Sequence, residues 1–295
     1  MPLWKHYQTA ESINNALQAL ISAPGVSRLV AGGTDLLLDL QQGRHPPVDT
    51  LVDVTRIPEL LKIEIRSGEL FIGAGVPLAK IERSKLVYKH GQALVEACTL
   101  IGGPQVRNSA TLGGNVAHGL PAADGTIALL ALGAKAEVAN IQGYFTLPIE
   151  DLFVGPGCTN LNPEQDLLVG FYLPLNKFGM ASAFQRVMRP QGVALPIINM
   201  AVWLYRKRNP LSDDEIMDIR ISVGPGGPVP TRAKEVEAYL RNKTISEDLL
   251  AEAMKIIMEE INFRTSPYRA TSVYRQYLSK VLLREVLIAA WMRAQ

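Results

Sequence analysis

The chain has 295 residues, of which 47% are hydrophobic and 20% charged, and its formal net charge is +2. This composition is typical of a soluble globular protein with two or three cores and favours no polyanionic partner, so we do not expect nucleic-acid binding. The apolar runs fall short of the roughly 18 residues of a membrane span, and the N-terminus lacks the pattern of a signal peptide, so we expect a cytoplasmic chain.

The first 58 residues predict a small α/β unit. A helix is expected over residues 12–21, and its apolar face would carry Ile13, Ala16, Leu17, Leu20 and Ile21. A buried strand over 28–32, a short helix over 34–42 and a strand over 50–54 complete the unit.

Residues 59–175 predict a second α/β unit. The stretch LKIEIRSGELFIGAG is typical of a hairpin with Ser67 and Gly68 at its turn. Helices are expected around 80–88 and 93–101. Three further strands are expected over 134–140, 143–149 and 166–174.

From residue 176 the pattern changes to long strands followed by helices, which argues for a separate α+β domain. Three antiparallel strands are expected over 180–188, 196–207 and 216–224. Two helices should follow, and the run from 271 to 293 predicts one long helix or a bent pair. The predicted domains are therefore 1–58, 59–175 and 176–295.

The segment QVRNSATLGGNVAHGLPAAD, residues 105–124, is the richest in site chemistry and is expected to be loop-like. Gly113 and Gly114 permit positive φ, so the backbone N–H groups of residues 112–115 could approach an anion. Thr111 and Asn115 flank that pair with short polar side chains. Asp124 precedes an apolar run that predicts a helix, and its alternative role is the N-cap of that helix.

A second glycine pair occurs upstream in AGGTDL, residues 31–36, between a predicted strand and a predicted helix. Such a junction presents unpaired N–H groups that suit a diphosphate. It is not G-x-G-x-x-G and lacks the GK[ST] of a P-loop, so the nicotinamide and ATP fingerprints are absent. Two such glycine loops in one chain favour a phosphate site over a pair of ordinary turns.

Several stretches together resemble the FAD-binding medium subunit of the molybdenum hydroxylases, the family of xanthine dehydrogenase, carbon monoxide dehydrogenase, nicotinate dehydrogenase and 4-hydroxybenzoyl-CoA reductase. They are AGGTDLL, LVDVTRIPEL, IGAGVPL, QVRNSATLGGN, LPAAD with ALLALGA, SAFQRVMR, ALPIINMAV and SVGPGGPVPTRAKEVEAYL. The resemblance covers nearly the whole chain. It implies an α+β fold in which two subdomains bind FAD and a C-terminal domain adds a three-stranded antiparallel sheet plus helices.

The resemblance also implies that FAD lies between the first two subdomains, with its diphosphate on the two glycine loops. By the same mapping, Asp124 would accept hydrogen bonds from the ribityl hydroxyls, Leu167 or Leu168 would line the flavin or adenine pocket, and Arg186 would stand near the polar edge of the flavin ring. No catalytic residue or metal ligand is assigned. The candidate cofactor-binding residues are Ala31, Gly32, Gly33, Thr34, Asp35, Leu36, Thr111, Gly113, Gly114, Asn115, Asp124, Leu168 and Arg186.

Three positions depart from the family pattern. Ala110 stands where many relatives have Gly, which a negative φ would permit. Leu120 stands where Ser is common, and Arg186 stands where Lys is common, which keeps the charge but changes its shape and hydration. The resemblance therefore leaves the electron acceptor open.

Cys98 and Cys158 are too few for an iron–sulfur cluster, which takes four thiolates, and we expect Cys98 to be a small buried hydrophobe. The resemblance implies two partners, a large molybdopterin-binding subunit and a small subunit with two [2Fe–2S] clusters, together with an external electron acceptor. Candidate docking surfaces are residues 150–165 and the C-terminal helices. His118 is expected to be structural or solvent-facing, with a flavin contact as the alternative.

Three functions are compatible with the sequence. The first, which we favour, is an electron-transfer flavoprotein subunit that passes electrons from partner iron–sulfur clusters through FAD to the acceptor. The second is a self-sufficient FAD-dependent oxidase or dehydrogenase, which would need an acid/base group that no motif announces. The third is a nucleotide-binding scaffold without turnover.

Overall fold

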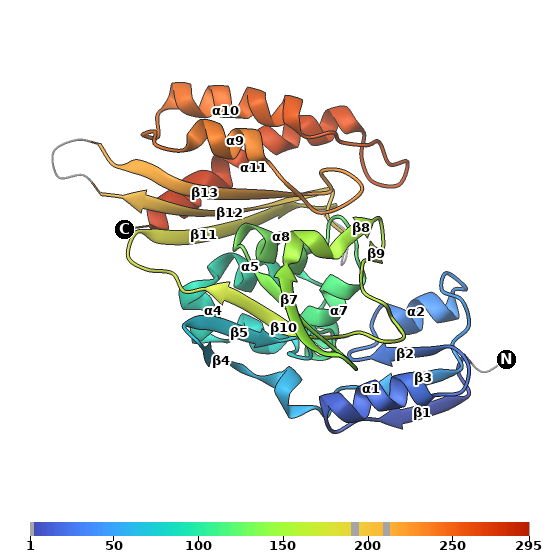
Figure 1. The fold of residues 1–295 in the computed structure, drawn as a ribbon. Helices are drawn as coiled ribbons and strands as arrows, with labels where there is room; N and C mark the ends of the chain where they lie inside the picture. The colour runs from blue at the N-terminus through green and yellow to red at the C-terminus, as the bar shows by residue number, and fades with distance from the viewer. Residues whose placement is uncertain (1–2, 190–194, 209–212, 295) are drawn as a thin grey trace.

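The computed structural model describes residues 3–189, 195–208 and 213–294. Its elements form three larger sheets, with helices packed on them, and one small two-stranded sheet (Figure 1). The first sheet has three parallel strands in the order β1 (His6–Thr9), β3 (Thr50–Asp53), β2 (Ser27–Val30). Strand β1 was not predicted, because all four of its residues are exposed and carry no hydrophobic alternation.

Two helices belong to this first sheet, α1 (Ile13–Ser22) and α2 (Leu36–Gln41). Four of the five residues predicted for the apolar face of α1 are buried, whereas Ile21 is 46% exposed, so its assignment to that face was wrong. One buried cluster joins α1 and β3 to Phe71 and Leu167 of the second sheet. The first two units therefore share a core.

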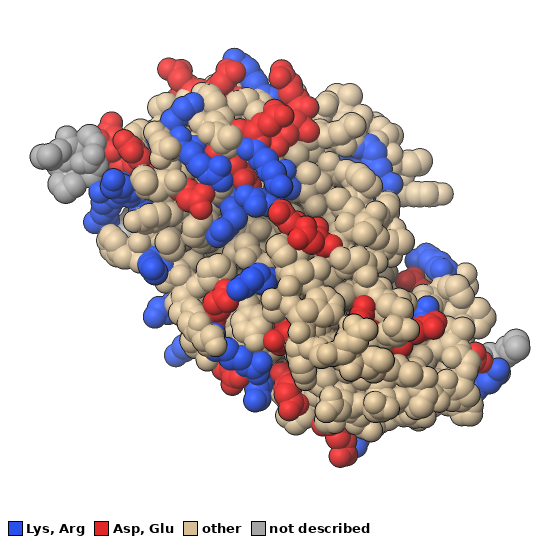
Figure 2. All heavy atoms as spheres, in the orientation of Figure 1, with Lys and Arg blue, Asp and Glu red and all other residues tan. Residues whose placement is uncertain are grey.

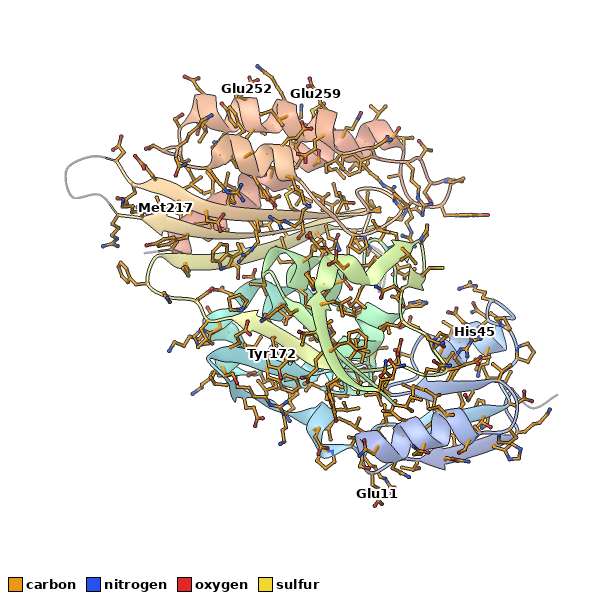
Figure 3. The ribbon with its side chains drawn as sticks, in the orientation of Figure 1. Glu11, His45, Tyr172, Met217, Glu252 and Glu259 are labelled. Carbon is orange, nitrogen blue, oxygen red and sulfur yellow. The ribbon has the colours of Figure 1, made fainter. Side chains whose placement is uncertain are left out.

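The second sheet is antiparallel throughout, in the order β4 (Ile63–Arg66), β5 (Glu69–Gly73), β10 (Leu167–Pro174), β6 (Lys135–Asn140), β7 (Gly143–Pro148). Ser67 and Gly68 form the β4–β5 turn with φ of 48° and 81°, as the hairpin prediction requires. Tyr172 on β10 (Figure 3) packs its ring 5.0 Å from that of Phe71, on the side of the sheet that meets the first unit.

The other face of this sheet is covered by short helices: α3 (Leu78–Glu82), α4 (Lys85–His90), α5 (Gln92–Leu100), α6 (Pro104–Ser109), α7 (Leu112–Ala117) and α8 (Asp124–Ala131). Residues 105–124 are therefore largely helical, and the prediction of a loop-like segment was wrong. Pro104 at the first position of α6 and the Thr111 cap of α7 start these two helices. Two 3-10 turns, Pro58–Leu61 and Ile149–Leu152, and a small hairpin, β8 (Phe153–Gly155) with β9 (Cys158–Thr159), complete the unit.

The third sheet contains the three predicted antiparallel strands, β11 (Met180–Val187), β12 (Ile198–Lys207) and β13 (Glu215–Gly224), and a short fourth strand, β14 (Thr231–Arg232), which was not predicted. Helices α9 (Lys234–Leu240), α10 (Glu247–Glu260) and α11 (Ser272–Arg293) cover one face (Figure 1). The final helix is continuous, which settles the choice between one helix and a bent pair.

The other face of the third sheet packs on α5 and α8, so alternate residues of β12 serve two cores. Ala201 and Trp203 belong to the core of the second sheet, while Met200, Val202 and Leu204 face the C-terminal helices. Both faces of β12 are thus buried, which explains its nearly continuous apolar sequence.

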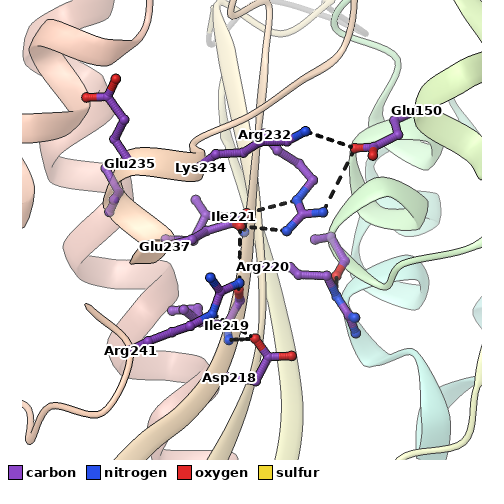
Figure 4. A network of polar contacts seen from close by, with 12 residues as sticks. Glu150, Asp218, Ile219, Arg220, Ile221, Arg232, Lys234, Glu235, Glu237 and Arg241 are labelled. Carbon is purple, nitrogen blue, oxygen red and sulfur yellow. Dashed lines mark hydrogen bonds and ion pairs between the residues drawn. The ribbon is translucent and has the colours of Figure 1, made fainter. Parts of the chain in front are cut away.

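Charged side chains also join the second and third units. Arg220 donates from Nε to the Ala131 carbonyl at 2.9 Å. Arg232 lies 3.9 Å from Glu150 of the second unit and forms an ion pair with Glu237 of the third unit at 2.6 Å (Figure 4). Elsewhere on the visible face, acidic and basic side chains are interspersed (Figure 2). Among the described residues, no helix has both the length and the apolar character needed to cross a membrane.

Candidate functional site

The upstream glycine loop, residues 31–36, lies against the second unit. Gly33 has φ of +66°, a backbone conformation that side chains with a Cβ rarely adopt. Gly32 touches the backbone of Ser109, and a Cβ added there would overlap the Ser109 carbonyl. Gly33 therefore permits the turn, and Gly32 permits the close approach between the two units.

The N–H groups of Gly33, Thr34, Asp35 and Leu36 have no acceptor among the described residues. Unpaired donors are expected at the start of a helix, and here Asp35 occupies the N-cap position of α2 without a capping hydrogen bond. These consecutive donors are therefore available to an anion.

The downstream loop differs from the prediction. The N–H groups of Leu112, Gly113 and Gly114 are already bonded to Val76 O (3.1 Å), Ala74 O (2.8 Å) and Thr111 Oγ1 (3.1 Å). The N–H of Asn115 donates to Thr111 O at 3.0 Å. Neither glycine has a positive φ, so the reason given for choosing these N–H groups as anion ligands was wrong.

Close packing explains the downstream glycines better. A Cβ on Gly113 would overlap Ala74, because α7 lies directly on the backbone that follows β5. Gly114 is exposed, and a Cβ there would meet only Thr111 Oγ1. Ala110 has φ of −60°, so this departure from the family glycine is accommodated without strain.

His118 links the two units. Its Nε2 lies 3.3 Å from Asp39 Oδ2 on α2, and its Nδ1 lies 3.8 Å from Asp35. These contacts give the side chain a structural role between the two units. The two loops are thus held together by the Gly32–Ser109 contact and by the His118–Asp39 pair.

Asp124 begins α8 but does not cap it, because Ala123 occupies the N-cap position and no side-chain cap bond forms. Its Oδ2 instead accepts from Arg186 Nη1 at 2.5 Å and its Oδ1 accepts from Asn199 Nδ2 at 2.5 Å. The side chains of Asp124 and Arg186 are 4% and 5% exposed. Burial raises the pKa of the Asp124 carboxyl, and Arg186 and Asn199 oppose that rise, so the carboxylate depends on both partners to stay ionised.

Several buried polar atoms around the start of α8 find no partner among the described residues. They are Asn115 Oδ1, Thr126 Oγ1, Arg186 Nε and Asn199 Oδ1. A buried polar atom without a hydrogen bond costs about 1–3 kcal/mol, so such a group of atoms indicates a ligand or ordered water. Asn199 was not among the predicted site residues, although an Asn inside the apolar run of β12 was a signal.

Leu168 lies at a register shift in the β10–β6 pairing and is 9% exposed. Bulges of this kind often occur beside functional sites because they redirect side chains. The predicted residues therefore fall into four groups: the loop and first residue of α2, the start of α7, the buried Asp124–Arg186 pair, and Leu168 on β10.

Comparison with known proteins identifies the family. Residues 4–176 match the FAD binding domain in molybdopterin dehydrogenase, and residues 182–290 match the CO dehydrogenase flavoprotein C-terminal domain. The chain belongs to the FAD-binding medium subunits of the molybdenum hydroxylases. Both the resemblance stated from the motifs and the expected α+β architecture are thereby confirmed.

Two relatives and one solved structure match this medium subunit over nearly their whole length. The nicotine 6-hydroxylase medium subunit of Paenarthrobacter nicotinovorans is 30% identical over 97% of both chains, and the xanthine dehydrogenase FAD-binding subunit of Escherichia coli O157:H7 is 27% identical over 96% of this chain and 95% of its own. A solved carbon monoxide dehydrogenase from Hydrogenophaga pseudoflava superposes with a TM-score of 0.91 at 27% identity, covering 99% of both chains.

The medium subunit is therefore an FAD-binding component of a multi-subunit molybdenum dehydrogenase. Its described residues suit that cofactor. The free N–H groups of residues 33–36 match the charge of a diphosphate, and the unpaired oxygens of Asn115, Thr126 and Asn199 match hydroxyl donors. Among the described residues, no group of His, Cys, Asp or Glu is placed to hold a metal ion.

Proposed function

We propose that this medium subunit transfers electrons from iron–sulfur clusters on a partner chain to an external acceptor, and that it does not act on an organic substrate alone. The partners would be a large molybdopterin-binding subunit and a small subunit with two [2Fe–2S] clusters, in the cytoplasm. Bound FAD supplies the redox chemistry, while the chain provides position and electrostatics. Cys98 is buried and Cys158 exposed, and neither lies beside another thiol, which supports placing the clusters elsewhere.

The residue roles are proposals of the same kind. Residues Ala31 to Leu36 would hold the diphosphate, with the N–H groups of residues 33–36 as its hydrogen-bond donors. Thr111, Gly113 and Gly114 would shape the site by packing and capping, while the Asn115 side chain would face the cofactor.

At the other end, Asp124 would accept hydroxyl hydrogen bonds through its remaining lone pairs, since each carboxylate oxygen accepts more than one bond. Arg186 and Asn199 would hold that carboxylate in place and ionised. Leu168 would line the apolar part of the pocket.

We also propose three structural units, 1–58, 59–175 and 176–295. The boundaries near 58 and 175 fall between the last strand of one larger sheet and the first strand of the next, which supports this division.

The observation that carries the cofactor placement is the run of four N–H groups, from Gly33 to Leu36, that have no acceptor within the described ranges. We expect Gly33→Val to remove bound FAD, because a branched side chain at φ +66° displaces these donors. Gly43→Val is the matched control, since Gly43 has φ of +65° with no atom within 4 Å of an added Cβ. Equal flavin content in the two purified variants would rule out this placement.

A further inference from the structure

Three arginines meet where the C-terminal domain turns from α10 into α11. Arg264 and Arg269 lie in the connecting segment, and Arg275 lies in the first turns of α11. The segment forms the end of the helical layer farthest from the C-terminus (Figure 1). Arg275 is 1% exposed and donates from Nη1 to the Arg264 carbonyl at 2.7 Å. Its buried Nε has no hydrogen-bond partner in the part of the chain that the structure describes.

None of these three arginines pairs with a carboxylate among the described residues, and the stretches outside the described ranges contain no Asp or Glu. They repel one another instead. Burial of the Arg275 side chain lowers its pKa, and the positive charges of Arg269 and Arg264 lower it further. Burial also lowers the pKa of Arg269, and the charge of Arg264 adds to that effect. A buried cation without a counter-charge is costly, so this arrangement calls for an anionic group from outside the chain.

The same surface exposes large aromatic and apolar side chains. Tyr268 is 85% exposed, Val273 72%, Tyr277 55% and Tyr274 47%. Tyrosine and arginine are the residue types enriched at the centres of protein interfaces. A small ion would leave these side chains in water, whereas a protein surface would cover them.

We propose that the arginine–tyrosine surface, residues 264–277, docks an acidic segment of a partner subunit of the molybdenum dehydrogenase. Carboxylates of that segment would lie against Arg264 and Arg269, above the buried Arg275, and the tyrosines would pack around them. Helix α11 adds the positive end of its dipole at the Thr271 cap. This inference rests on the proposed assembly with partner subunits and identifies where on this chain one of them binds.

The test uses the complete complex, with this chain co-expressed with its molybdopterin and iron–sulfur subunits. The double variant Arg264→Glu/Arg269→Glu should bind its partners about 30-fold or more weakly, the effect of losing a close interfacial charge pair. Lys85→Glu is the control, since Lys85 is exposed on α4 and has no ion pair among the described residues. FAD content should be unchanged in all of them.

A second variant separates docking from folding. Arg275→Met should leave the melting temperature of the free chain unchanged or higher, because it removes an uncompensated buried charge, and should still weaken assembly. Assembly of the double variant at wild-type affinity would overturn the proposal. The proposal would also fail if inorganic phosphate stabilised the free chain while the substitutions left assembly unchanged. Failure of the wild-type chain to assemble with either subunit would instead overturn the proposed function.

Discussion

Asp124→Asn is the substitution whose effect the structure specifies most closely. The change keeps the shape of the side chain but removes the charge that faces Arg186, and both side chains are about 95% buried. Breaking a buried ion pair by neutralising one partner costs about 3–5 kcal/mol, because the other charge stays buried. Arg186 keeps its bond to the Leu100 carbonyl, so we expect the lower end of that range in the free energy of unfolding.

The measurement is urea unfolding of the FAD-free protein, with linear extrapolation to water. Asp124→Asn/Arg186→Met should recover part of the loss, because it removes the uncompensated charge as well. Asp35→Asn is the matched control, because Asp35 also lies at the start of a helix. Its side chain is 55% exposed and makes no capping hydrogen bond. If Asp124→Asn cost less than about 1 kcal/mol, the reasoning from the buried ion pair would be refuted.

Two further predictions concern His90 and the cysteines. Burial and Lys89 lower the pKa of His90, so the unfolded chain binds the extra proton and stability falls as the pH drops below about 6.5. His90→Asn should flatten this dependence of stability on pH, because the amide oxygen can accept the 3.1 Å bond from the Asn176 N–H but cannot take up the proton. Equal pH dependence of the unfolding free energy in wild type and variant would contradict this. Burial also raises the pKa of Cys98, so thiol reagents should label only Cys158 until the chain unfolds; rapid labelling of both in the native chain would contradict the packing.

Local chemistry was predictable because its causes are local. The hairpin turn at Ser67 and Gly68, the helix over 12–21 and the free donors after Gly33 all follow from residues within a few positions of one another. Strand β1 could not be predicted in this way, because its polar residues form a strand only through pairing with β3, far along the chain.

The site was harder to predict for the same reason. Asp124 has a helix-capping position in the sequence, yet its partners Arg186 and Asn199 come from β11 and β12 of another unit. Gly113 lies in a sequence typical of an anion-binding loop, yet its N–H donates to the Ala74 carbonyl. That hydrogen bond depends on how α7 packs against the residues after β5. Sequence periodicity contains no information on either contact.

We propose that the FAD of this chain receives its electrons from partner subunits. The most direct test is anaerobic mixing of the purified flavoprotein with N-heterocycles, aldehydes and hydroxyaromatic acyl-CoA compounds while the flavin absorbance is followed. We predict a full flavin spectrum that none of these compounds bleaches, together with rapid electron exchange between artificial donors and acceptors. Rapid bleaching by any one of them, with no partner present, would contradict the account and establish a self-sufficient oxidase.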